Sequence, residues 1–141
     1  MSEKSKVVET HSFAVPAEKL WALVADFGGI DKIMDGIEEC AVEGEGVGAT
    51  RSIPMGEGCV VEALDVLDPE KKILTYSIVS GPMPFKNYSS TMVVVADGED
   101  ACTLTWTGTF EAAGVPREKA ERIASGVYRG GIAGYGRALG L

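Results

Sequence analysis

Turn-forming segments divide the middle of the chain at short intervals. Five of them lie between residues 37 and 111, and each contains glycine, proline or aspartate: 44–46, 55–58, 68–71, 81–84 and 96–100. Such residues favour tight chain reversals, and reversals this short join antiparallel neighbours. The pattern therefore predicts antiparallel strands at 37–43, 48–55, 59–67, 72–80, 86–96 and 101–111.

The strand expected at 101–111 shows the clearest alternation. Its threonines fall on one face, and the other face carries Cys102, Leu104, Trp106, Gly108 and Phe110. This alternation is typical of a half-buried strand whose threonine face meets water.

The strand expected at 86–96 has apolar residues on both faces instead. We interpret the face with Tyr88, Ser90 and Met92 as the wall of a cavity, with the intervening residues facing outward. The preceding segment, Gly81 to Pro84, is expected to form a loop at the rim, since prolines cannot donate to a strand ladder.

Proline marks the start of two expected helices. A first strand at about 7–14 leads to Pro16, and apolar residues then recur at helical spacing until Gly28. A second short helix is expected at 30–34. Pro116 opens a final helix that ends near residue 139, roughly 35 Å long at the usual helical rise and able to cross a sheet. Together these elements predict an α+β fold.

Glycine recurs along the expected final helix. Gly126, Gly130 and Gly134 are spaced by four, with Gly131 next to the second. Because glycine weakens a helix, such a row favours either close packing on the sheet or room for a ligand, and the sequence leaves both open. We predict that the row faces the sheet, that Val127, Gly130, Gly131 and Gly134 contact a ligand, and that Gly130→Leu fills a cavity.

The overall charge limits the partners of the protein. The formal net charge over 141 residues is −8, which argues against binding the phosphate backbone of nucleic acids. Apolar runs are far shorter than the roughly 20 residues that cross a bilayer, and no secretory signal is visible. We therefore expect a cytoplasmic domain spanning 1–141. The oligomeric state, monomer or homodimer, stays open.

Few residues are available for metal or nucleophilic chemistry. Cys40, Cys59 and Cys102 are widely spaced and form no CxxC pattern, so free, mostly buried thiols are expected. With His11 as the single histidine, neither a metal site nor a Ser-His-Asp triad is predicted, and Ser90 is no nucleophile. No phosphate-binding glycine motif is present. The sequence thus predicts no metal and no cofactor.

Several segments together resemble a known superfamily. "VPAEKLWALVADFGGI", "GVGATR", "VVEALDVLD", "NYSSTMVV" and "LTWTGTFEA" are similar to the bacterial polyketide cyclase/dehydrase-type proteins of the START-like (SRPBCC) superfamily. The resemblance covers nearly the whole chain. It implies the helix-grip fold, a curved antiparallel sheet around a long C-terminal helix with an internal cavity. Carriers, receptors and enzymes all belong to this superfamily, so the resemblance specifies fold more than chemistry.

The same segments are similar to the plant abscisic-acid receptors, another branch of the superfamily. The resemblance implies pocket positions for Glu62, Tyr88, Ser90 and Trp106, and it puts Glu38 where the receptors carry a ligand-binding lysine. The loop at 53–59 is too short for the receptors' gate, and "GPMPF" lacks their latch. Abscisic-acid sensing is therefore not expected.

Spacing alone pairs Arg51 with Glu62. If Gly56 and Glu57 are the two loop residues of a hairpin, Arg51 lies directly opposite Glu62 on one face. On the outer surface this would be a weak ion pair, whereas on the concave face it would lie in the cavity, with Glu62 ionised beside the cation. The resemblance favours the inward arrangement.

Other polar candidates are less determined. Either Glu38 or Glu39 could face inward, and an acid without a cation in an apolar cavity would act as a general acid or base. Tyr88 offers a hydroxyl to a ligand carbonyl or to a proton relay. The orientations of Tyr76, Tyr128 and Tyr135 stay open.

Two functions follow from these features. The first is binding of a small, mainly hydrophobic molecule, such as a polyketide, aromatic or lipid-like compound, in a cavity between sheet and helix. The second is a cofactor-independent enzyme (cyclase, dehydratase or lyase) that uses Glu62, Tyr88 and Glu38 for acid–base chemistry.

Overall fold

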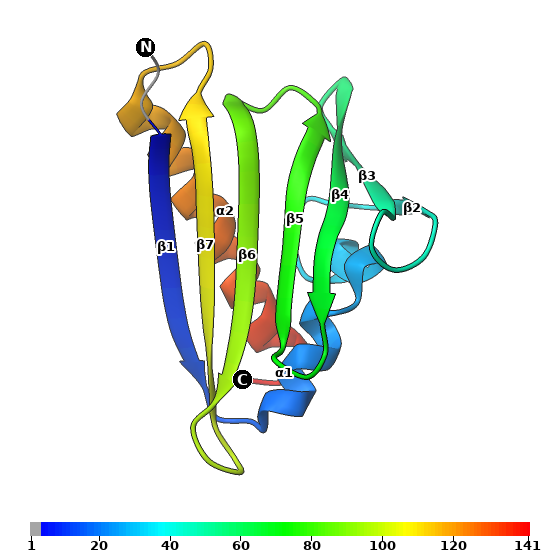
Figure 1. Ribbon diagram of the computed structural model, residues 1–141, viewed down its shortest axis with the longest axis vertical. Coiled ribbons are helices and arrows are strands. Elements are labelled where there is room, and N and C mark those ends of the chain that lie inside the picture. The colour runs from blue at the N-terminus through cyan, green and yellow to red at the C-terminus, as the bar shows by residue number, and fades with distance from the viewer. Residues whose placement is uncertain (1–3) are drawn as a thin grey trace.

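Strands account for most of the elements between the N-terminus and the final helix. The structure, a computed structural model, describes residues 4–141. In chain order the elements are β1 (Lys4–Phe13), α1 (Ala17–Val24), the 3₁₀ helix η1 (Phe27–Lys32), β2 (Ala41–Glu43), β3 (Thr50–Met55), β4 (Gly58–Asp68), β5 (Ile73–Ser80), β6 (Phe85–Ala96), β7 (Cys102–Ala112) and α2 (Arg117–Ala138) (Figure 1).

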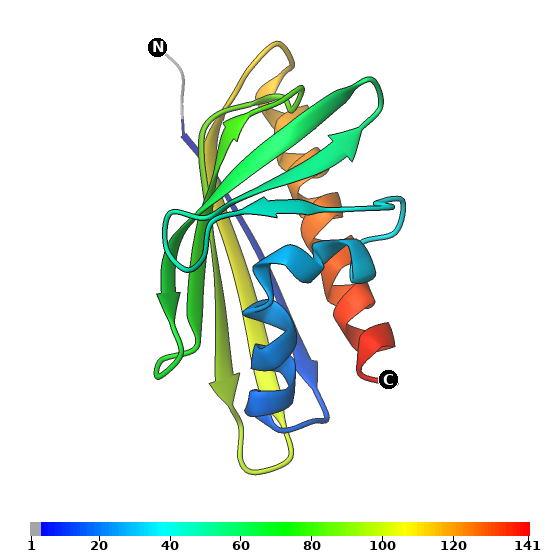
Figure 2. The same cartoon turned by 90° about the vertical axis from the view of Figure 1, so that its right-hand side faces the viewer.

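The strands form one antiparallel sheet in the order β1-β7-β6-β5-β4-β3-β2. Each hairpin places consecutive strands side by side, and the N-terminal strand β1 closes the row by pairing with the last strand, β7. The helix α2 packs on β1 and β7, and the sheet curves around it, with α1 and η1 on the same side (Figure 2). The predicted α+β class is confirmed.

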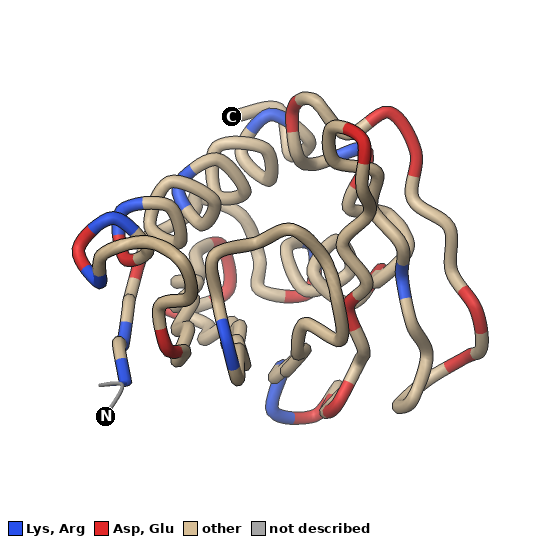
Figure 3. Tube along the Cα trace, turned by 90° about the horizontal axis from the view of Figure 1, so that it is seen from above, with Lys and Arg blue, Asp and Glu red and all other residues tan. Residues whose placement is uncertain are grey.

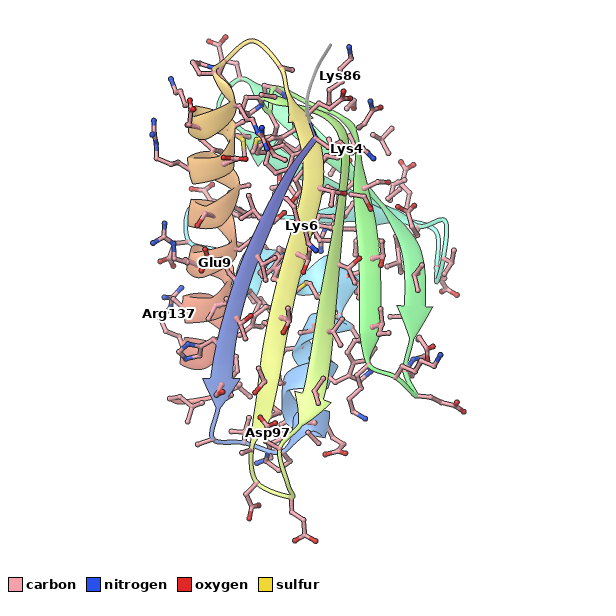
Figure 4. The ribbon with its side chains drawn as sticks, turned by 60° about the vertical axis from the view of Figure 1, so that its left-hand side comes forward. Lys4, Lys6, Glu9, Lys86, Asp97 and Arg137 are labelled. Carbon is pink, nitrogen blue, oxygen red and sulfur yellow. The ribbon has the colours of Figure 1, made fainter. Side chains whose placement is uncertain are left out.

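Polar contacts join α2 to β1 and to the loop after η1. The Ser125 hydroxyl donates to the Glu9 carboxylate of β1 at 2.6 Å, and Arg137 contacts Asp35, in the loop after η1, at 3.1 Å. Figure 4 shows Glu9 on β1 and Arg137 near the C-terminal end of α2. These contacts hold α2 between the first strand and the loop after η1.

Most predicted strand bounds are confirmed within about two residues; β1 begins three residues earlier than expected, at Lys4, and β2 differs most. The expected strand at 37–43 is reduced to Ala41–Glu43, and all three residues are exposed. β2 lies at the edge of the sheet and pairs with β3 alone, so no second neighbour extends it. The helix expected at 30–34 is instead the 3₁₀ helix at 27–32.

The glycine row of α2 does not face the sheet as predicted. Gly126 and Gly130 are exposed, and only Gly134 of the three is buried. Steps of four residues advance about 40° beyond a full turn, so a row spaced by four winds off the buried face. The buried face follows mixed steps of three and four instead: Ala120, Ala124, Tyr128, Gly131, Ile132, Gly134 and Tyr135.

The thiols are also less buried than expected. Cys102 is buried in the core, Cys40 is intermediate and Cys59 is exposed. Cys59 lies near the start of β4, beside the tight β3–β4 turn, and it alternates with the buried Val60, so it points to the outer face. No disulfide joins the three cysteines, as predicted.

Candidate functional site

A cavity of about 100 Å³ lies between the concave face of the sheet, α2 and the η1 segment. Its walls are mainly apolar, and methionine and isoleucine side chains supply much of the surface. The lining residues are Ile30, Met34, Ile37, Arg51, Ile53, Met55, Val60, Glu62, Tyr76, Ile78, Met83, Phe85, Tyr88, Trp106, Ala124 and Val127.

Arg51 and Glu62 form a buried ion pair in this cavity. They are register partners across the β3–β4 hairpin, so the predicted pairing is confirmed. Nε of Arg51 donates to Oε1 of Glu62 at 2.8 Å, and Nη2 lies 2.8 Å from the same oxygen. The residues are 6% and 9% exposed, which settles the inward alternative over the surface one.

The 3₁₀ helix η1 holds the guanidinium of Arg51 from the other side. Nη1 of Arg51 donates to the carbonyl oxygen of Phe27 at 2.9 Å. The guanidinium carbon lies 4.1 Å from the centre of the Phe27 ring and 5.0 Å from that of Tyr76, positions that favour cation–π attraction. Arg51 is thus fixed by contacts from three elements, which keeps Glu62 in place as well.

Burial changes the acidity of Glu62. Removal from water raises the pKa of the Glu62 carboxyl, and the charge of Arg51 and its hydrogen bond to the carboxylate offset part of the increase. Glu62 therefore takes up a proton more readily than a glutamate in water.

Three tyrosine hydroxyls meet at the cavity. The Tyr88 hydroxyl on β6 is hydrogen-bonded to that of Tyr128 on α2, and it lies 3.5 Å from the Tyr76 hydroxyl on β5. The Trp106 indole stacks on the Tyr128 ring with centres 4.8 Å apart and donates from Nε1 to the Ser90 hydroxyl at 2.8 Å. A continuous polar cluster therefore joins the sheet to α2.

The position of Tyr128 depends on a glycine in β7. A Cβ added at Gly108 would lie only 1.8 Å from the Tyr128 hydroxyl oxygen. The absent side chain leaves the space in which that hydroxyl reaches Tyr88. The sequence predicted that Gly108 lies on the inner face of its strand but did not determine the orientation of Tyr128. A glycine among large inward-facing residues was the sequence feature that could have indicated space for another side chain.

The tyrosines predict an unusual alkaline titration. All four, Tyr76, Tyr88, Tyr128 and Tyr135, are buried, and burial raises the pKa of each above its ordinary value. The folded state thus holds these protons more tightly than the unfolded chain. Their contribution to stability is complete below the ordinary tyrosine pKa of about 10 and is lost as the pH rises through the folded values.

We expect no tyrosinate absorbance near 295 nm at pH values where free tyrosine is already ionised. The signal should appear in one cooperative step that coincides with loss of far-ultraviolet circular dichroism. The urea-unfolded protein, which should titrate as free tyrosine, is the control. A gradual tyrosinate signal from protein that is still folded would contradict the expectation.

Some of the site residues predicted from the sequence line the cavity, and others are buried nearby. Arg51, Glu62, Tyr88, Trp106 and Val127 line the cavity. Ser90 and Met92 are buried on the predicted inner face of β6 but are not among the residues that line the cavity. Their roles toward a ligand stay predictions.

The remaining site residues differ in where the structure places them. Glu38 and Glu39 are both exposed, because the chain at 37–40 forms no strand that would turn one of them inward. Gly130 is exposed, although an added Cβ would lie 3.8 Å from Cε of Met34, so the effect of Gly130→Leu on the cavity stays a prediction. Gly131 and Gly134 serve close packing: added Cβ atoms would lie 2.5 Å from Cζ3 of Trp106 and 1.9 Å from the Ile33 carbonyl oxygen.

Sequence reasoning also missed much of the apolar lining. Met34 and Ile37 come from the segment after η1, and Met83 comes from the loop between β5 and β6, where the rim was expected. Their apolar character was visible, but no periodicity in an irregular segment shows which way a side chain points.

The described residues, 4–141, show neither a basic face nor a metal-binding cluster. Basic and acidic residues are interspersed along strands and helices rather than gathered on one basic face (Figure 3). Residues 4–141 contain no cluster of histidine, cysteine and acidic side chains that would hold a metal ion. Within the same residues, no helix is both long and apolar enough to cross a membrane.

A curved sheet that grips a long C-terminal helix over a largely apolar cavity defines the helix-grip class of the START-like superfamily. The family model described as polyketide cyclase / dehydrase and lipid transport matches residues 4–139, and the chain belongs to this family. The predicted superfamily and fold are thereby confirmed.

Two plant proteins are among the relatives by sequence. The chain is 31% identical to MLP-like protein 423 of Arabidopsis thaliana over 110 residues, which cover 68% of this chain and 69% of that protein. It is 32% identical to the abscisic acid receptor PYL10 of Arabidopsis thaliana over 96 residues, 64% of this chain and 52% of the receptor. The matched region thus spans about half of the receptor's length.

Solved structures share the architecture. A protein from Thermobifida fusca superposes with a TM-score of 0.80 at 28% identity, covering 94% of this chain and 93% of that one. XoxI from Bacillus cereus gives a TM-score of 0.86 at 24% identity, covering 95% and 94%. Norcoclaurine synthase from Thalictrum flavum gives 0.76 at 16% identity, covering 98% and 87%. The last two likenesses concern the fold alone.

Proposed function

We propose that the protein binds a small, mainly hydrophobic molecule in the cavity between the sheet and α2. The observation that carries the proposal is the composition of the walls, in which apolar side chains surround one ion pair and the Tyr88 hydroxyl. Ligand sites combine apolar surface with a few placed polar groups in this way. The apolar surface supplies affinity, and the polar groups select and orient the ligand.

Relatives support the proposal through what their names state. PYL10 is a receptor for abscisic acid, and norcoclaurine synthase is described in complex with dopamine and hydroxybenzaldehyde. Both bind small molecules. The proposal extends the binding of a small molecule, and not the identity or charge of those ligands, to the present chain.

Native mass spectrometry of the purified protein tests the proposal directly. We expect a small molecule that stays bound under gentle ionisation and is lost on denaturation. A library of polyketide-, aromatic- and acyl-type compounds in a thermal-shift screen extends the test to empty protein. No stabilisation by any of them, together with no co-purified compound, would contradict the proposal.

Replacing Tyr88 by phenylalanine should weaken binding of the ligand found in that screen roughly fivefold, the value of one hydrogen bond. The change removes one hydroxyl from the cavity wall and keeps the ring contacts with Phe85 and Phe110. Tyr135→Phe is the matched control, because Tyr135 is equally buried but does not line the cavity. Equal affinities for both variants, measured by calorimetry, would remove Tyr88 from the site.

Acid–base catalysis without a cofactor is the second candidate function. The observation that favours it is a buried carboxyl, Glu62, whose pKa is raised in the same cavity as the Tyr88 hydroxyl. A carboxyl and a hydroxyl placed together in this way can exchange protons with a bound substrate. Glu38, which is exposed, has no part in this version. Incubation with the co-purified compound, followed by mass spectrometry for a cyclised, dehydrated or cleaved product, distinguishes enzyme from carrier.

A further inference from the structure

The cavity walls contain opposite charges that cancel at contact distance. Among the lining residues in the described range 4–141, the charged side chains are Arg51 and Glu62. Each nitrogen of the guanidinium is already engaged, Nε and Nη2 with Oε1 of Glu62 and Nη1 with the Phe27 carbonyl oxygen. Arg51 therefore offers no excess positive charge to an anionic ligand.

Glu62 differs from Arg51 because one of its atoms is unused. Both guanidinium contacts fall on Oε1, whereas Oε2 accepts no hydrogen bond from any residue within 4–141. In that part of the chain no fully buried polar side-chain atom lacks a partner, so Oε2 is not sealed in the interior. Because Glu62 lines the cavity, its second oxygen is an open acceptor at the cavity wall.

The tyrosine hydroxyls add no charge to the cavity. Tyr76 and Tyr88 line the cavity next to the ion pair, and burial raises the pKa of both, so they stay neutral phenols. Much of the hydrogen-bonding capacity of Tyr88 is already shared with Tyr128 and Tyr76. Glu62 is left as the strongest free acceptor that faces a ligand.

Resting on the proposed function, we infer that the ligand is a neutral molecule with a hydroxyl group that donates to Oε2 of Glu62, and that the cavity discriminates against carboxylic acids. A hydroxyl donating to a carboxylate forms a charge-assisted hydrogen bond, which is stronger than a neutral one. A ligand carboxylate would instead meet a like charge in surroundings that screen it poorly. A protonated amine would add an uncompensated charge to an apolar cavity.

A matched series of probes with one ring system tests this selectivity. We would titrate the native protein with 2-naphthol, 2-methylnaphthalene and 2-naphthoate by calorimetry at neutral pH. The expected order is naphthol first, with methylnaphthalene and naphthoate each at least roughly tenfold weaker, the size of one charge-assisted hydrogen bond. A fourth probe, 2-naphthylmethylamine, should bind more weakly than the naphthol.

Two variants test whether Glu62 causes the preference. Glu62→Gln leaves the Arg51 charge uncompensated, so the preference for naphthol over naphthoate should disappear or reverse. Arg51→Met/Glu62→Met removes both charges and avoids an unpaired cation that could unfold the single variant. In this double variant naphthol and methylnaphthalene should bind equally well, with folding checked by circular dichroism.

The outcomes separate the inference from the function on which it rests. Tight binding of methylnaphthalene with no preference for naphthol, or naphthoate binding as tightly as naphthol, overturns the inference and leaves hydrophobic binding intact. Tightest binding of the amine also overturns it, since the ligand would then be a cation. No binding of any probe to the native protein counts against the proposed function and the inference together.

Discussion

Replacing Gly134 by alanine should destabilise the protein by about 3 kcal/mol, at the upper end of the usual cost of overpacking. An added Cβ would lie 1.9 Å from the carbonyl oxygen of Ile33 and 2.7 Å from its carbon. These are backbone atoms, so no side-chain rotation relieves the clash, and α2 must move away from the segment after η1. Urea unfolding followed by circular dichroism measures the change.

Gly126→Ala is the matched control within the same helix. Gly126 is exposed and an added Cβ meets no atom within 4 Å, so the better helix propensity of alanine should stabilise the protein by up to about 1 kcal/mol. The two alanines should therefore act in opposite directions. If both variants were equally stable, the close approach of α2 to Ile33 would be refuted.

Removing Arg51 alone should have the largest effect of any single change in the cavity. Arg51→Met leaves the Glu62 carboxylate buried without its cation, which typically costs about 3–5 kcal/mol. Arg51→Met/Glu62→Met should recover most of this loss, because two apolar side chains then replace the pair. Denaturant unfolding of both variants at neutral pH gives the comparison.

The effect of Arg51→Met should also depend on pH in a defined direction. Burial raises the pKa of Glu62 and Arg51 opposes the increase, so the variant has a still higher pKa in the folded state. A raised pKa favours the folded state below the carboxyl pKa of the unfolded chain, and this contribution is lost as the pH rises through the folded value. The variant should thus be closest to the native protein in acid. A loss that is constant from acid to neutral pH would show that Glu62 is not the cause.

The sheet and the hairpin register were predictable because both depend on local signals. Turn residues fix where strands end, and a two-residue loop at Gly56 and Glu57 fixes that Arg51 faces Glu62. Alternation in the same way put Tyr88 on the inner face of β6. For these residues short-range chemistry and the final structure agree.

The helix side of the cavity was predicted less well, because there the orientation depends on packing. The spacing of Gly126 and Gly130 suggested a buried row, but the bulk of Tyr128 and Tyr135 turned a different face toward the sheet. Glu38 was misplaced because the pairing of an edge strand is decided by neighbours that local sequence does not reveal. The meeting of Tyr88 with Tyr128 likewise joins elements 40 residues apart.

The pairing of β1 with β7 has a consequence for the order of folding. Lys4 lies opposite Glu111 and Phe13 opposite Cys102, so β1 has no partner until β7 has been synthesised. During translation the backbone groups of β1 stay unpaired while the hairpins from β3 to β7 form between neighbouring segments of the chain. Because pairings between distant parts of a chain form slowly, we expect the docking of β1 on β7 to be a late step of folding. The helix α2 follows β7 in the chain, so the cavity that both elements line can form only after every strand of the sheet has been made.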